Sequence, residues 1–404
     1  MTVITQTTAA DAQAPAAEEL ITRAAALVPL LRKNAAQTEQ DRRVVEENIQ
    51  ALREAGLFKI AVPRRFGGYE VPFGTFLQVS GELARGDGST AWVTTLMNVC
   101  SWLAGLYPER AQQDIYGQDP DARICGVLAP TATSRHADGG QVVTGSWGFA
   151  SGCMHSQWAM LGIPVVDEQG EQVDQGLALV PMSDLAIKDT WYVAGMRGTA
   201  SNTLVAQEVF VPSYRILPVP PAIEGSYPTE HDDEALYRAA FVPVLALVLA
   251  GPQVGLARGA LEVVMESLAK GRGISYTFYS KSSLAPTTQL QVAEAAQLID
   301  TAFLHLMRAA GDIDQAAQSG HYLDFGGRAR VRADVGTVAR RCREAVELLL
   351  NVHGAGSFAE ANPLQRIWRD LEVCSRHAVV NADISHELYG RALLGVAEQI
   401  TALI

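Results

Sequence analysis

The chain has 404 residues, a formal net charge of −12 from 32 basic and 44 acidic residues, 48% hydrophobic residues and 19% charged residues. These values are ordinary for a folded globular protein and allow two or three domains, so they exclude disorder along the whole length. The acidic balance also argues against nucleic-acid binding, because that function needs a basic face to neutralise phosphates.

The apolar runs and the cysteines predict a cytoplasmic protein. No basic region followed by an apolar region opens the chain, so no secretory signal is expected. The most apolar run, residues 239–250, contains Pro243 and is shorter than the ~20 residues that span a bilayer, so no membrane association is expected. The five scattered cysteines form no Cys-x-x-Cys pair and predict neither a disulfide framework nor a metal site.

The first part of the chain is predicted to be helical. Residues 1–16 are small and polar and predict a flexible arm. Apolar residues three and four apart begin after Glu18 and indicate a helix. We expect an N-terminal helical domain over residues 17–120, with further helices at 44–55, 73–83 and 89–106.

The sequence pattern changes near residue 121. From there, short apolar runs alternate with turn residues, which is typical of strands. Strands are predicted at 124–128, 141–150, 158–166, 177–181 and 203–211. A proline-rich connector at 217–221 follows them. We therefore expect a central β domain over residues 121–230.

From residue 231 the pattern is almost wholly helical and predicts a C-terminal domain over residues 231–404. Its long segments are predicted at 234–269, 287–318, 328–352 and 363–402. Four long antiparallel helices suit a four-helix bundle. The expected fold class is therefore α+β.

Several common catalytic and nucleotide-binding motifs are missing. No Gly-x-Gly-x-x-Gly follows a predicted strand, and no phosphate-binding loop ends in Gly-Lys-Ser/Thr. There is also no Gly-x-Ser-x-Gly elbow and no His-Glu-x-x-His. These absences argue against a nicotinamide site on a Rossmann unit, an NTPase and a zinc protease.

Three segments in order resemble the acyl-CoA dehydrogenase superfamily, and more closely its flavin-dependent monooxygenase branch. They are Thr144–Gly152 (TGSWGFASG), Trp191–Thr203 (WYVAGMRGTASNT) followed by Val209–Pro212 (VFVP), and Asn362–Asp370 (NPLQRIWRD) with His377 behind it. The resemblance covers about residues 18–400. It implies an N-terminal helical domain, a central β domain, a C-terminal four-helix bundle, and a homo-oligomer, with a tetramer expected.

The resemblance also implies the chemistry. Reduced flavin, supplied as a diffusible cosubstrate by a separate flavin reductase, reacts with O2 to form a C4a-hydroperoxide, whose distal oxygen passes to an electron-rich substrate. The protein excludes water and readies the substrate, because the cofactor carries the difficult chemistry. An aromatic or polyketide-like substrate is expected, and FMN is expected in preference to FAD.

His377 separates this branch from the dehydrogenases. A dehydrogenase of this superfamily carries a glutamate eight residues after the Arg-Asp pair, which here is Arg369-Asp370. That position is Ala378, and His377 precedes it. The resemblance therefore implies His377 as a catalytic acid or base, whose ordinary pKa near neutrality suits proton transfer. The alternative is a histidine satisfied inside a helix.

The resemblance places three residues of one strand beside the flavin. Ser151 is implied at flavin N5, with a turn serine as the alternative. Phe149 and Trp147 are implied as walls of the flavin site, with core packing as the alternative for both.

The resemblance also implies a second set of residues, which binds the tail of the flavin. Arg272 stands where dehydrogenases have Arg-x-x-Phe-Gly, but the Phe-Gly is absent here. The alternative is a solvated surface arginine. The tail of a flavin in a neighbouring subunit is expected near His353, Gly354, Gly356 and Ser357, where the glycines could also simply end a helix.

Four residues are expected near the substrate in addition to His377. Arg197 is implied at the substrate entrance, although a structural role in the turn is favoured. Phenol-hydroxylating relatives carry a histidine eight residues after the tryptophan that matches Trp92, and here that position is Cys100. A thiol is a weak donor, so a simple p-hydroxyphenyl acid is disfavoured, and Asn98 is the further candidate contact.

Other functions remain open from the sequence. Oxygenation of the nitrogen of an amino sugar or amine is the first alternative. An acyl-CoA dehydrogenase is the second, disfavoured by the missing glutamate. A flavin-free scaffold that kept the fold is the third.

Overall fold

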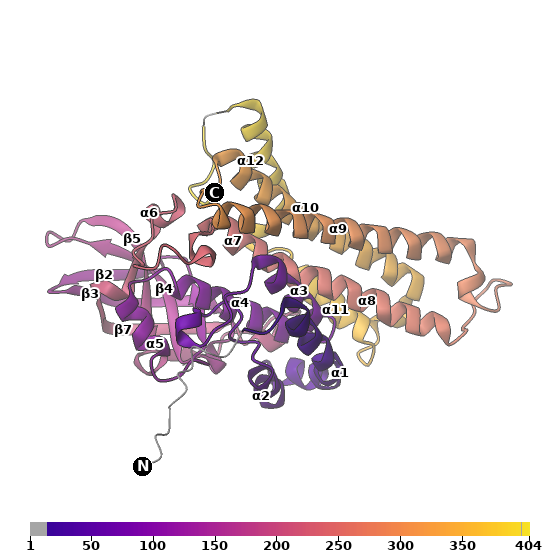
Figure 1. The fold of residues 1–404 in the computed structure, drawn as a ribbon. Helices are drawn as coiled ribbons and strands as arrows, with labels where there is room; N and C mark the ends of the chain where they lie inside the picture. Colours follow the sequence, from indigo (N-terminus) through magenta and orange to yellow (C-terminus); the bar gives the residue numbers. More distant parts are fainter. Residues whose placement is uncertain (1–13, 397) are drawn as a thin grey trace, which may run out of the picture.

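The computed structural model describes residues 14–396 and 398–404, and most of the predicted arm at 1–16 lies outside them. Along the described chain, helices come first, two sheets follow, and helices complete the molecule (Figure 1). The sheets lie at one side and the long C-terminal helices extend away from them (Figure 1). The predicted α+β fold class is confirmed.

The N-terminal helices surround one buried helix. They are α1 (Ala17–Asp41), α2 (Glu46–Glu54), α3 (Phe73–Ala84), α4 (Gly88–Ala104) and α5 (Glu109–Tyr116), of which α5 was not predicted. Apart from Leu96, every residue of α4 is buried. Asp87 caps its start, where the carboxylate accepts from the backbone N–H of Thr90 at 2.8 Å. This helix therefore lies at the centre of the molecule, against several other elements.

The central region contains two four-stranded sheets. One has the order β1-β4-β5-β8, from β1 (Ile124–Val127), β4 (Trp158–Val166), β5 (Gln172–Pro181) and β8 (Ile216–Pro218). The other has the order β2-β3-β7-β6, from β2 (Ala132–Ala137), β3 (Gly140–Ala150), β7 (Asn202–Pro212) and β6 (Ala186–Lys188). The register of β3 against β7 shifts between Trp147 and Ala150, so a bulge interrupts the pairing near Phe149.

The C-terminal helices differ from the prediction at their end. After α6 (Val219–Ile223), they are α7 (Phe241–Leu247), α8 (Gly251–Ala269), α9 (Pro286–Gln318), α10 (Phe325–His353), α11 (Pro363–Cys374) and α12 (Ala382–Leu394). The last segment, predicted as one helix at 363–402, is two helices. His377 lies in the break between them, so the alternative that placed it inside a helix is wrong.

The expectation that no segment is long enough to span a membrane needs correction. The stretch Phe241–Ala269 is long and apolar enough by length and composition. However, 89% of its most apolar window is buried inside the protein. Its apolar surface is therefore used in the packing of the helical core.

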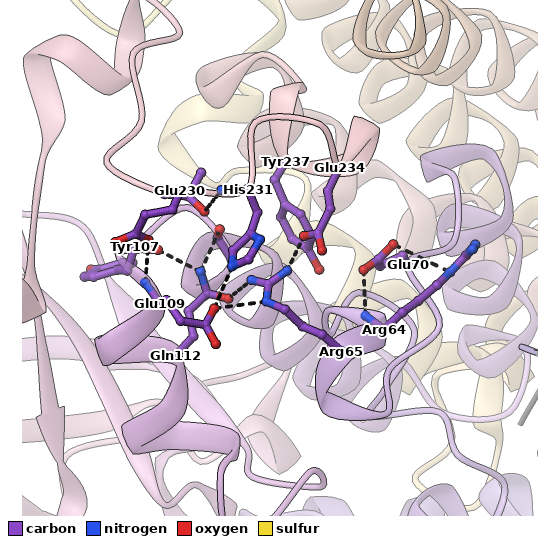
Figure 2. Close-up of polar contacts among 12 residues, drawn as sticks. Arg64, Arg65, Glu70, Tyr107, Glu109, Gln112, Glu230, His231, Glu234 and Tyr237 are labelled. Atoms are coloured by element: carbon purple, nitrogen blue, oxygen red, sulfur yellow. Dashed lines mark hydrogen bonds and ion pairs between the residues drawn. The ribbon is translucent and has the colours of Figure 1, made fainter. Parts of the chain in front are cut away.

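A polar network joins the N-terminal helices to the segment that follows the sheets (Figure 2). Arg65 forms an ion pair with Glu109 of α5 at 3.1 Å and another with Glu234, and it also contacts Gln112. His231 lies 2.7 Å from the same Glu109 carboxylate. One half-buried guanidinium thus holds together three segments that are distant in sequence.

A second link between distant segments is the cap of α3. The first two backbone N–H groups of this helix, from Phe73 and Gly74, donate to the carboxylate of Asp314 at 2.9 and 3.1 Å. Asp314 belongs to α9, about 240 residues later in the chain. Burial raises the pKa of this carboxyl group. The α3 helix therefore takes its N-terminal cap from the C-terminal domain.

Candidate active site

Two segments expected beside the flavin and the substrate meet where β3 ends against α4. Gly152, just after β3, has φ +76°, and a Cβ built on it would lie 2.8 Å from Met97 and 3.0 Å from Val93 of α4. The residue before Val93 is Trp92, whose ring centroid lies 6.2 Å from that of His377. Contacts along α4 therefore connect the end of β3 to the break after α11.

His377 is exposed to solvent, whereas its neighbour Trp92 is buried. The protein around the ring nevertheless removes part of its solvation, and this partial desolvation lowers the pKa of the imidazole. Because its pKa is lowered, the neutral form dominates at pH 7, and a neutral imidazole nitrogen can accept a proton. The structure thus offers an accessible base beside an aromatic ring.

Phe149 combines an uncommon backbone conformation with an exposed side chain. Its φ is +64°, a left-handed conformation that is uncommon for a bulky side chain. The ring is 75% exposed and meets the ring of Trp191 edge-on at 5.6 Å. Core packing, the alternative for this residue, is therefore wrong.

Trp147, two residues earlier, has the opposite environment. Its side chain is fully buried between the sheets, and its indole N–H donates to the carbonyl of Gly162 at 2.8 Å. The expectation that Trp147 forms a wall of the flavin site is corrected, because this ring belongs to the core of the β domain.

Ser151 is buried, and its hydroxyl lies 2.7 Å from the hydroxyl of Ser201. Ser201 lies equally close to Thr199, at 2.7 Å. The backbone N–H of Gly152 donates to the carbonyl of Thr199 at 2.9 Å, which fixes the two segments relative to each other. Sequence reasoning missed Thr199 and Ser201, although both lie inside the quoted Trp191–Thr203 segment.

The turn that carries Thr199 is held by a buried carboxyl group. Asp370 of α11 accepts from the backbone N–H of Met196 at 2.5 Å. Burial, together with the nearby carboxylate of Asp87, raises the pKa of Asp370 to about 7. Met196 and Ala200 both have positive φ, at +54° and +46°. Uncommon backbone conformations thus cluster at this site, as they do at many functional sites.

Arg197 lies in the same turn and is half-buried. Its Nε is buried and has no hydrogen-bond partner among the described residues. An unpaired buried donor costs about 1–3 kcal/mol. Arg197 is therefore a candidate to bind a polar group of a ligand.

Asn98 and Cys100 lie on buried faces of α4. Asn98 is fully buried, and its amide donates to the carbonyls of Leu57 and Thr94 at 2.8 and 2.9 Å. Cys100 packs against Gly126 of β1, and burial raises the pKa of its thiol to about 12. The expected substrate contacts of both residues are corrected, because both side chains are used in interior packing.

The second predicted group forms a separate cluster at the end of α10. His353 lies near Arg272, and the pKa of this imidazole is lowered by burial first and by the arginine charge second. Nδ1 of His353 is buried and has no hydrogen-bond partner in the part of the chain that the structure describes, and Nε2 lies 3.3 Å from the amide nitrogen of Asn362. Gly354 has φ 77° and ψ −167°, a conformation essentially restricted to glycine. Ser357 is buried, and its hydroxyl donates to the carbonyl of Gly354 at 2.6 Å.

The two clusters do not meet within one chain. Asn362, in the second cluster, caps the start of α11, whereas His377 follows its end. A helix of 12 residues is about 18 Å long. Arg272 is exposed, and the same is true of Gly356. One chain therefore presents two separate clusters, one with Ser151 and His377 and one with Arg272 and His353.

Two cavities of the structure lie outside both clusters. One, of about 150 Å³, is lined by residues that include Asp87, Arg366 and Asp370, so it lies behind the Met196 turn. The other, of about 420 Å³, lies beside the network of Figure 2 and is lined by residues that include Arg64 and Asp314. Neither is lined by Phe149, Ser151 or His377, of which Phe149 and His377 are exposed to solvent and Ser151 is buried.

Comparisons with known proteins identify the family. The N-terminal domain of acyl-CoA dehydrogenases matches residues 17–118, and their C-terminal domain matches residues 247–382. The oxygenase subunit HsaA of a flavin-dependent monooxygenase from Rhodococcus jostii is 33% identical, over 92% of this chain and 97% of that protein. The oxygenase component of an FADH(2)-dependent resorcinol hydroxylase from Rhizobium sp. is 35% identical, over 93% and 94%.

Solved structures agree with these relatives. XiaF from Streptomyces sp., in complex with FADH2 and glycerol, superposes with a TM-score of 0.89 at 33% identity, covering 95% of this chain and 97% of that one. The 3-HSA hydroxylase from Rhodococcus sp. RHA1 superposes with a TM-score of 0.90 at 32% identity, covering 96% and 99%.

The fold and the site therefore define a flavin enzyme of the acyl-CoA dehydrogenase superfamily, and the chain belongs to this family. Within it, the chain is the oxygenase component of a two-component flavin-dependent monooxygenase, and such a component implies a separate flavin reductase. The dehydrogenase and nitrogen-oxygenation alternatives are not favoured, since these relatives are named as monooxygenases and hydroxylases.

Proposed function

We propose that this oxygenase hydroxylates an aromatic ring, using O2 and reduced flavin. The observation that carries the proposal is the solvent-exposed His377 beside the ring of Trp92, on the helix α4 that also contacts Gly152 at the end of β3. Named relatives support an aromatic substrate. They include the resorcinol hydroxylase and the oxygenase component of p-hydroxyphenylacetate 3-hydroxylase from Acinetobacter baumannii, which is 29% identical.

The residues of the first cluster suit a flavin ring. Phe149 offers an aromatic face held out by a left-handed backbone, and Ser151 offers a hydroxyl beside it. When bound, the reduced flavin supplies the oxygen-transfer chemistry. We propose that Ser151 and Phe149 orient the ring and that the Arg197 guanidinium binds a polar group of the substrate.

His377 then acts on the substrate proton. A phenol becomes a better nucleophile when its O–H proton is removed, and a positioned base contributes ~10²–10⁴-fold to such a step. The imidazole is neutral at pH 7 because burial lowers its pKa. His377 is therefore proposed as the base that accepts the phenolic proton, with Trp92 packing against the substrate ring.

We propose FADH2 as the flavin, in place of the FMN expected from the sequence. Two relatives above 30% identity use or bind FADH2 by name, the FADH(2)-dependent resorcinol hydroxylase and XiaF in complex with FADH2. The FMN-bound structure of TdsC is 19% identical and shows the fold alone. Anaerobic titration with FADH2 and with FMNH2 tests the choice, and tighter binding of FMNH2 would restore the original expectation.

We also propose a homo-oligomer, with a tetramer as the expected form. In it, the cluster with Ser151 and His377 of one subunit and the cluster with Arg272 and His353 of another subunit together form one flavin site. The supporting observation is the separation of the clusters by the length of α11, about 18 Å. Large apolar side chains beside Arg272 are also fully exposed, namely Tyr276 and Phe278. Light scattering tests the state, and a monomer that binds flavin fully would contradict it.

The activity is tested with the purified chain, an unrelated NADH:flavin reductase and ¹⁸O2. Resorcinol and p-hydroxyphenylacetate serve as probes, and mass spectrometry detects incorporation. We expect one ¹⁸O atom in the ring product and no steady NADH oxidation without the reductase. Hydrogen peroxide as the sole oxygen product over a broad panel of phenols would contradict ring hydroxylation.

A further inference from the structure

Three buried hydroxyl groups form a chain that ends at the proposed flavin face. Ser151 is 6% exposed, Ser201 3% and Thr199 1%. Oγ of Ser151 lies 2.7 Å from Oγ of Ser201, and Oγ of Ser201 lies 2.7 Å from Oγ1 of Thr199. Oγ1 of Thr199 lies 2.8 Å from the carbonyl oxygen of Met196. These separations are typical of O–H···O hydrogen bonds.

The Met196 carbonyl fixes the direction of every bond in this chain. A carbonyl oxygen only accepts, so Thr199 donates its single hydroxyl proton to Met196. Thr199 then has only lone pairs for Ser201, so Ser201 donates to Thr199. Ser201 has no second proton, so Ser151 donates to Ser201. The proton of Ser151 therefore points inward, and only its lone pairs remain for a ligand.

The Met196 carbonyl also holds Trp191, the ring against which Phe149 packs. The indole N–H of Trp191 donates to Met196 at 2.9 Å, and the Trp191 ring meets Phe149 edge-on. Asp370 in turn accepts from the N–H of Met196. The acceptor that sets the chain is thus held from both sides and is not free to rotate.

We propose that Ser201 and Thr199 are positioning residues that make Ser151 a hydrogen-bond acceptor, so that the site selects reduced over oxidised flavin. The inference rests on the proposed function, in which Ser151 meets flavin N5. In oxidised flavin N5 is an imine nitrogen that only accepts, whereas in reduced flavin N5 carries a hydrogen and donates. An acceptor-only serine is complementary to the reduced ring and presents lone pair to lone pair against the oxidised ring.

The test measures dissociation constants for FADH2 and FAD by anaerobic titration of the full-length protein. Ser201→Ala removes the acceptor of the Ser151 hydroxyl. Thr199→Val removes the acceptor of the Ser201 hydroxyl, which can then donate to Ser151. In both variants the Ser151 hydroxyl becomes free to donate toward the ligand. We expect FAD to bind about tenfold more tightly in both variants, while FADH2 binding changes little, because one hydrogen bond is gained. Ser151→Ala should instead weaken FADH2 binding, because the acceptor is lost, and should not weaken FAD binding, because the opposed lone pairs are removed.

The direction of change separates this role from general damage to the site, which would weaken both forms together. Thr203→Val is the matched control, because Thr203 and Thr190 form a neighbouring hydroxyl pair at 2.8 Å outside the chain. An unchanged ratio of the two constants in both folded variants would overturn the inference. A wild-type protein that binds neither form of flavin would instead overturn the proposed function.

Discussion

Replacement of Asp370 by asparagine should remove a pH-dependent loss of stability. Asp370 is buried, and its Oδ1 accepts from the Met196 N–H at 2.5 Å. Asparagine has the same shape and keeps an oxygen acceptor but does not titrate. Burial and the Asp87 carboxylate raise the pKa of Asp370 to about 7, whereas an unfolded aspartate titrates near 3.9.

The sign follows from proton binding. Between these two pKa values the folded state holds a proton that the unfolded state has released, so stability falls as pH rises. The contribution of Asp370 is fully present below about pH 4 and is lost as pH rises through 7. With a folded pKa of about 7, the loss between pH 6 and pH 8 is about 1.4 kcal/mol of the free energy of unfolding.

Urea unfolding followed by tryptophan fluorescence provides the assay. We expect Asp370→Asn to gain about 1.4 kcal/mol on the wild type between pH 6 and pH 8. Asp383→Asn is the control, because the Asp383 side chain is 91% exposed. A constant difference between Asp370→Asn and the wild type across this range would show that Asp370 is already ionised at pH 6, which would refute the argument from burial.

Three further predictions concern the site and its support. His377→Ala should lower the hydroxylation rate ~10²–10⁴-fold and release hydrogen peroxide while flavin affinity stays near wild type. The control is His136→Ala, which replaces an exposed histidine. If both variants form the same amount of product per O2 consumed, His377 has no role in the hydroxylation step. Phe149→Gly should weaken flavin binding without a loss of melting temperature, because glycine relieves a left-handed conformation that costs ~1–2 kcal/mol; unchanged flavin affinity would argue against the wall. Gly195→Ala should destabilise the protein by ~1–3 kcal/mol, since its Cβ would lie 2.1 Å from the Arg369 carbonyl oxygen, and an unaltered urea midpoint would contradict this contact.

Long, strongly patterned elements were predictable, and short or exposed ones were not. The strand β4 has the predicted bounds because its sequence, WAMLGIPVV, contains no polar side chain except the indole N–H of Trp158, and most of it is buried. β6 has three residues, all exposed, so no alternation marks it. The break between α11 and α12 was missed because residues 375–381 contain neither glycine nor proline. The backbone turns there without the usual signal.

The site was predictable where a motif specified a residue and not where burial decided its role. Phe149 and Ser151 lie at the end of β3, as their motif indicated, whereas His377 lies in a break after α11 where one continuous helix was predicted. Asn98 and Trp147 were expected to touch ligands, but both are buried, and their side-chain N–H groups donate to backbone carbonyls inside the protein. Thr199 and Ser201 gave no signal, because a hydroxyl chain depends on distances between side chains that sequence spacing does not encode.

The cap that Asp314 gives to α3 has a consequence for the order of folding. Residues 17–116 leave the ribosome long before Asp314 is made, so the first N–H groups of α3 must wait without this partner. Loss of an N-cap costs a helix about 1 kcal/mol, and contacts at such sequence separation slow folding. The N-terminal helices are therefore expected to remain loosely ordered during synthesis and to become rigid only when α9 docks. A nascent chain stalled before residue 286 should be far more sensitive to protease than the released protein.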